Sequence, residues 1–94
     1  MALTLVEISH LNNKIKSCYT DLDELVQHLG DLEQSHQMSS EEFSHKFSAG
    51  ELSHETDFLE WFAYLDMSRS VLAKIRQLEH ELGNVLEQKL LVPA

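Results

Sequence analysis

Three glutamate–histidine pairs near one predicted turn are the residues whose types and spacing come closest to a metal site. In each pair the histidine follows the glutamate by three positions, so on a helix both side chains face the same way. The pairs are Glu33/His36, Glu42/His45 and Glu51/His54. Di-iron carboxylate bundles use this spacing, but their ligands project inward from long helices beside further glutamates. Here all three pairs lie at or beside a predicted turn, which favours polar surface over a metal site.

Acidic side chains around the start of the last predicted helix allow a magnesium interpretation. They are Glu51, Glu55, Asp57, Glu60 and Asp66. Carboxylate oxygens suit a hard cation, and all-helical nucleotide pyrophosphohydrolases hold magnesium with Glu-Glu-x-x-Glu and Glu-x-x-Asp pairs. That pairing is not found here, because Glu41-Glu42 is followed by His45 instead of a third acid. We expect the acids to complement the helix dipole and to form a solvated face.

The sequence also contains no clear candidate for a catalytic nucleophile. Cys18, the single cysteine, falls on an apolar helix stripe, where a thiol behaves as a small hydrophobic side chain. The sequence has no His-x-x-x-His or Cys-x-x-Cys spacing, no glycine-rich phosphate loop and no Gly-x-Ser-x-Gly elbow. We therefore predict a non-enzymatic protein without catalytic residues, metal or cofactor. The alternative is a metal-dependent helical-bundle enzyme with a di-iron or magnesium site.

The elements that would position such residues are helices. Only three glycines and one proline interrupt the 94 residues, and no stretch alternates apolar with polar residues as a half-buried strand does. We predict a first helix over residues 3–34, where apolar residues recur at alternating intervals of three and four, the heptad spacing of a helix seam. This stripe consists of Ile8, Leu11, Ile15, Cys18, Leu22, Leu25, Leu29 and Leu32.

A short helix and a second long helix complete the chain. Ser39 and Glu42 form a capping box before a helix over residues 40–48, and Gly50 suits the left-handed position that ends it. Ser53 is a candidate N-cap for a helix over residues 54–88. The stripe of this helix repeats the heptad spacing through Trp61, Tyr64, Ser68, Val71, Ile75, Leu78, Leu82 and Val85. The last five residues are apolar without periodicity, which leaves open whether they fray or dock on a partner.

Two long helices of similar length, joined by a short helical elbow, predict one all-α domain over residues 1–94 that forms an antiparallel hairpin. Both stripes are wider than a two-helix seam can cover, because further apolar residues flank each of them. Burying one large apolar side chain contributes about 1.5–3 kcal/mol. We therefore predict a homodimer that forms a four-helix bundle through the two stripes, with a different protein as the less favoured occupant.

Charge and composition limit the partners. Sixteen acidic against seven basic residues give a formal charge of −9, which argues against nucleic acid and against an anionic membrane surface, since both need a basic face. No apolar run approaches the roughly 18–20 residues of a membrane span. The N-terminus lacks the basic and apolar parts of a signal peptide. Because a single cysteine forms no internal disulfide, we expect a cytoplasmic protein.

Aromatic residues with interleaved acids form the most unusual segment, and we predict a partner-binding surface there. Tryptophan and tyrosine dominate binding hot spots, and the acids would attract a basic partner. Packing of the elbow against the hairpin is the competing explanation. The predicted surface residues are Glu51, Asp57, Phe58, Glu60, Trp61 and Tyr64.

The same segment resembles part of a group of small helical prokaryotic proteins, some labelled antitoxins and many uncharacterised. Their pattern has a short helix, then Gly-Glu-Leu, two acids and an Asp-Phe-Phe-Glu-Trp-like start to a long helix. It is matched here by Gly50, Glu51, Leu52, Asp57, Phe58, Glu60 and Trp61. The chain departs from it at Ser53-His54-Glu55 and at Leu59. The resemblance, over residues 41–64, implies no catalytic residue and a protein that binds a partner, such as a basic toxin. An assembly chaperone is a further alternative.

Overall fold

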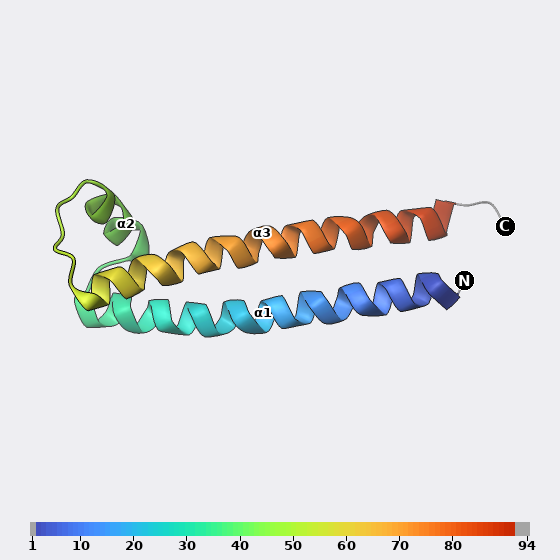
Figure 1. The fold of residues 1–94 in the computed structure, drawn as a ribbon, viewed down its shortest axis with the longest axis horizontal. Helices are drawn as coiled ribbons and strands as arrows, with labels where there is room; N and C mark the ends of the chain where they lie inside the picture. Colours follow the sequence, from blue (N-terminus) through green and yellow to red (C-terminus); the bar gives the residue numbers. More distant parts are fainter. Residues whose placement is uncertain (1, 92–94) are drawn as a thin grey trace.

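The computed structural model describes residues 2–91, and this part of the chain is all-helical. The long helices α1 (Ala2–His36) and α3 (Thr56–Leu91) lie side by side and antiparallel, and α2 (Ser40–Ser48) is the short helix at the elbow (Figure 1). The predicted all-α hairpin with a helical elbow is thereby confirmed. α3 continues past the predicted end at residue 88, and residues 92–94 of the predicted tail lie outside the described part.

The hairpin is a rod of 62 × 21 × 17 Å with a radius of gyration of 18.7 Å. A compact domain of this length would have a radius of gyration of about 12 Å. The accessible surface of the rod is 6912 Å², whereas a folded monomer of this mass exposes about 5,500 Å². Two helices side by side therefore leave roughly 1,400 Å² more surface in water than a compact fold does.

The core lies along the seam between α1 and α3 and continues under α2. Its buried apolar side chains are Leu11, Ile75 and Leu78 along the seam, and Phe43 and Trp61 at the elbow. The other predicted stripe residues are half-buried, apart from Ser68, because one neighbouring helix covers only part of each stripe. They are Ile8, Ile15, Cys18, Leu22, Leu25, Leu29, Leu32, Tyr64, Val71, Leu82 and Val85. Ser68 is buried in the seam, and its hydroxyl donates to the Tyr64 carbonyl at 2.8 Å.

α1 ends two residues beyond the predicted boundary, and Gly30 lies inside it. The chain leaves α1 through Gln37, whose φ of 51° lies in the left-handed region. The Met38 amide then donates to the Glu33 carbonyl at 3.1 Å. This hydrogen bond and this conformation are typical of helix C-termini that end in glycine, so a glutamine at this position carries a steric cost.

Replacing Gln37 with glycine should stabilise the fold by about 0.5–1 kcal/mol, because glycine adopts a positive φ without steric conflict. Urea unfolding followed by circular dichroism measures the change. Gln34→Gly, a substitution within the last turn of α1, is the control and should destabilise by about 1 kcal/mol. A Gln37→Gly variant no more stable than the parent protein would contradict the steric argument.

α2 has the predicted boundaries, and its predicted caps are present at both ends. The Ser39 hydroxyl accepts a hydrogen bond from the Glu42 amide at 3.0 Å. Gly50, with a φ of 74°, follows the helix, and the Glu51 amide donates to the Lys46 carbonyl at 3.0 Å. The short helix is therefore specified by its two ends, since nine residues alone would be a marginal helix.

The predicted start of α3 at His54 is wrong. The helix begins at Thr56, and the amides of Phe58 and Leu59 both donate to the Glu55 carbonyl at 3.0 Å. Ser53, the predicted N-cap, lies in the non-helical segment 51–55. The prediction failed because the chain needs this segment to cross from the end of α2 to the start of α3.

Candidate functional site

The elbow encloses an aromatic cluster that joins α2 to α3. The Phe43 ring stacks on the Trp61 indole with centroids 4.2 Å apart and an interplanar angle of 2°. Both side chains are completely buried. The indole Nε1 donates to the Ser40 hydroxyl at 2.9 Å, so its polar atom is satisfied inside the cluster. Trp61 is therefore a core residue of the elbow.

The end of α1 closes one side of this cluster. The His36 ring lies against Phe58 and Trp61, at centroid distances of 5.0 and 5.7 Å, and its Nε2 is 3.1 Å from Asp57 Oδ2. The Glu33 carboxylate accepts a hydrogen bond from the Ser40 amide at 2.7 Å, at the positive end of the α2 dipole. Glu33 thus links α1 to α2, and His36 links α1 to α3.

The side chains of the other two glutamate–histidine pairs are exposed on the elbow surface. Glu42 Oε2 is 3.9 Å from Lys46 Nζ, one turn along α2. The His54 ring lies 6.0 Å from the Phe47 ring. Over residues 2–91, no group of three or more His, Cys, Asp or Glu side chains is placed to hold a metal ion.

The residues predicted to bind a partner differ in exposure. Glu51, Asp57 and Glu60 are exposed, Phe58 and Tyr64 are half-buried, and Trp61 is completely buried. In this conformation Trp61 has no surface to offer a partner. The apolar surface of the elbow belongs instead to Leu59 and Phe62, which are 49% and 47% exposed.

Leu59 and Phe62 were missed because the sequence analysis followed the heptad stripe. The sequence did carry a signal, since neither residue lies on the line through Trp61, Tyr64 and Ser68 that faces the seam. Phe62 is held by the Phe47 ring of α2, with centroids 5.4 Å apart. The elbow therefore offers a fixed apolar surface in a segment that also carries exposed carboxylates.

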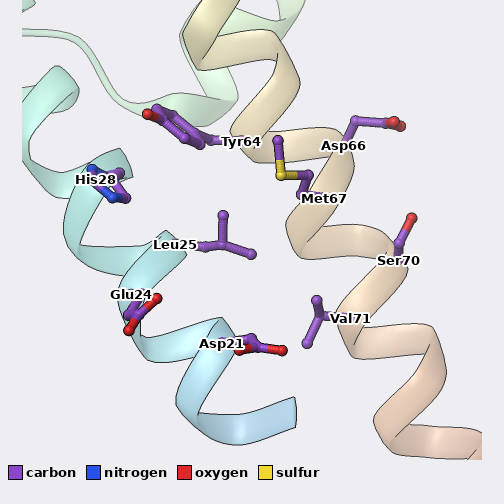
Figure 2. Close-up of a pocket in the computed structure, with 9 residues that line it drawn as sticks. All are labelled: Asp21, Glu24, Leu25, His28, Tyr64, Asp66, Met67, Ser70 and Val71. Atoms are coloured by element: carbon purple, nitrogen blue, oxygen red, sulfur yellow. The ribbon is translucent and has the colours of Figure 1, made fainter. Parts of the chain in front are cut away.

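A groove open to solvent runs between α1 and α3 next to the elbow (Figure 2). Leu25 and Val71 point into the space between the helices, and Asp66 points outward. At one end the His28 ring stacks on the Tyr64 ring, with centroids 4.8 Å apart. The lining residues are Asp21, Glu24, Leu25, His28, Tyr64, Asp66, Met67, Ser70 and Val71.

A second open groove lies farther along the same hairpin, toward the start of α1. Glu7, His10, Leu11, Lys14, Glu81, Asn84 and Val85 line it. Both grooves are open to solvent and have charged side chains in their lining, whereas ligand pockets are largely enclosed. The elbow surface is therefore the stronger candidate for a functional site.

Comparison of the chain with family models, curated proteins and solved structures gave no match. Within residues 2–91, no helix combines the length and the apolar character that crossing a bilayer requires.

Proposed function

We propose that this protein is a non-enzymatic, cytoplasmic interaction module whose hairpin pairs with a second copy to form a four-helix bundle. The observation that carries the proposal is the incomplete burial of both heptad stripes. Among residues 5–88, whose side chains the structure describes, the buried apolar residues along the seam are Leu11, Ile75 and Leu78. A second hairpin would cover the remaining stripe surface.

The surface area supports a dimer. Each hairpin exposes roughly 1,400 Å² more than a compact monomer of its mass. If two copies covered this excess, the interface would bury about 2,800 Å² in total, which lies within the range of obligate homodimers. A protein of this size is also marginally stable as a monomer, because short chains bury a small fraction of their surface.

If folding and dimerisation are coupled, unfolding will depend on protein concentration. The thermal midpoint should rise by several degrees between about 2 and about 200 µM protein, because mass action favours the associated state. Circular dichroism at 222 nm measures the midpoint. A midpoint that does not move over this range would contradict the proposal.

Treatment with a chelator should leave the thermal midpoint unchanged, whereas a lower midpoint would favour the metal-dependent enzyme.

The elbow supports a second contact, with a basic protein. Its apolar surface consists of Leu59 and Phe62, and the exposed Asp66 lies one turn along α3 from Phe62. The other exposed acids of the elbow are Glu51, Glu55, Asp57 and Glu60, of which Asp57 pairs with His36 of α1. Apolar anchors within a charged rim are the usual composition of an interface, and the charge accelerates the approach of a basic partner. This is the role that the resemblance to antitoxins implies, whereas an assembly chaperone would pair the faces of its hairpin with another chain.

A tagged full-length chain expressed in its own host should co-purify a basic protein at fixed stoichiometry. In titrations with the two purified proteins, Phe62→Ala should weaken binding about tenfold or more, because it removes an interface anchor. Met67→Ala is the matched control, since Met67 is 48% exposed but lies on another side of α3. Equal losses for the two variants would contradict a contact at the elbow.

A further inference from the structure

We propose that the second copy docks on one particular side of the hairpin, and that the grooved side stays in solvent. This inference rests on the dimer proposed above and names the surface through which it forms. We call that surface the apolar side. It consists of Leu5, Tyr19 and Val26 of α1 and Leu65, Leu72 and Leu86 of α3.

The heptad pattern places these residues beside the seam. On α1 the three residues recur every seven positions and form one row, interrupted by Asn12. On α3 the row has the same seven-residue spacing and is interrupted by Glu79. A seven-residue interval returns to nearly the same helix face, so each set forms a mostly apolar strip along its helix with one polar interruption.

One contact shows that the two rows lie on the same side of the hairpin. The Tyr19 hydroxyl donates to the Glu79 carboxylate at 3.4 Å, across the seam from α1 to α3. The two rows therefore form one surface. The row on α1 extends from Leu5 to Val26, which corresponds to about 32 Å of helix.

The other side of the hairpin has the opposite character. Its rows line the two open grooves and include Glu7, Lys14, Asp21, His28, Met67 and Glu81. Met67 is the single apolar residue in these two rows, whose remaining members are Ser35, Glu60, Lys74 and Gln88. The hairpin thus has one apolar and one polar side, although the two sides flank the same seam.

Five of the six residues of the apolar side are exposed in the single hairpin, and Leu65 is half-buried. Val26 is 54% exposed and Leu72 is 37% exposed. A contiguous surface of this kind on a small protein marks an interaction site. Covering it would also cover the seam residues that face this side, whereas Leu25, Val71 and Val85, which line the grooves, would keep their exposure.

Charge favours the apolar side over the grooved side for the docking of a second copy. Each chain carries a formal charge of −9, so two copies repel each other wherever acids face acids. On the polar rows four acids outnumber two lysines, whereas on the apolar side Glu79 is the one charge between Leu5 and Val26 on α1 and between Leu65 and Leu86 on α3. The apolar side is therefore where a second acidic copy approaches with least repulsion.

Two glutamate substitutions test the choice of side. Leu72→Glu should raise the dimer dissociation constant about 100-fold or more, since it places a charge in an apolar interface. Met67→Glu introduces the same charge on the grooved side and should leave the constant within about threefold. Sedimentation equilibrium measures both, with circular dichroism at high concentration as the folding control. A larger effect of Met67→Glu would overturn the inference.

A labelling experiment tests the same surface without disrupting it. In a Cys18→Ser background, single cysteines are introduced by Val26→Cys or by Met67→Cys, at sites with similar exposure in the single hairpin. In the purified dimer, alkylation of the thiol at position 26 should be about tenfold slower or more than at position 67, because burial blocks the reagent.

The outcomes separate the two proposals. Slow alkylation at position 26 with fast alkylation at position 67 supports docking on the apolar side. Equal rates, or protection at position 67 alone, in a protein that sediments as a dimer would overturn the inference and leave the dimer standing. A purified protein that remains monomeric would overturn both.

Discussion

Trp61→Ala should destabilise the protein by about 3–5 kcal/mol, the usual cost of deleting a buried aromatic side chain. Trp61 is completely buried and stacks on Phe43, so the deletion leaves a cavity between α2 and α3. Domains of this size are typically stable by about 5–15 kcal/mol, so the loss is a large fraction of the total. Urea unfolding followed by circular dichroism measures it.

The control is the neighbouring aromatic residue. Phe62 is 47% exposed, so Phe62→Ala should cost about 1 kcal/mol or less in the same experiment. Trp61→Phe separates the contribution of the hydrogen bond from that of aromatic packing, because it retains an aromatic ring but removes the hydrogen bond to Ser40. It should cost more than Phe62→Ala and less than Trp61→Ala. Equal losses for Trp61→Ala and Phe62→Ala would contradict the assignment of Trp61 to the core.

Leu78→Ala should be the second most damaging change, with a loss of about 2–5 kcal/mol. Leu78 is 2% exposed in the seam between α1 and α3, where few side chains are fully buried. The matched control is Leu59→Ala, which removes the same atoms from a side chain that is 49% exposed. Its expected cost is about 1 kcal/mol or less. The difference in unfolding free energy between the variants measures the contribution of the seam.

A difference close to zero between Leu78→Ala and Leu59→Ala would contradict the position of the core. It would mean that the hairpin is held together elsewhere along its length. The comparison should be made at one protein concentration, because the stability of a dimer depends on the concentration of its subunits.

The two long helices could be predicted because the residues that determine them are close together in the sequence. Apolar residues at intervals of three and four require only that the helix turn at its usual pitch, and the stripe from Ile8 to Leu32 does so without interruption. Gly30 did not break the first helix, since its cost of about 1 kcal/mol is small against the packing on both sides of it. The short helix was predictable from Ser39 and Gly50, which specify its two ends.

The elbow was less predictable because its contacts join residues that are far apart in the chain. The His36–Asp57 pair and the Trp61–Ser40 hydrogen bond each span 21 residues, and no local spacing encodes them. The heptad stripe placed Trp61 on the inward face, but whether α2 would cover it depended on where α2 packs. Ser53 is a further case in which a local preference did not decide the structure. Serine favours the N-cap position, but Ser53 lies in the segment that connects α2 to α3, and α3 begins at Thr56.

The most direct test of the central claim is the mass of the full-length protein by sedimentation equilibrium over a micromolar dilution series. Mass at equilibrium is independent of shape, which matters for a rod that is 62 Å long. The account predicts a species of twice the chain mass of 10.8 kDa. A mass of 10.8 kDa at every concentration, from a protein whose circular dichroism remains helical, would contradict it.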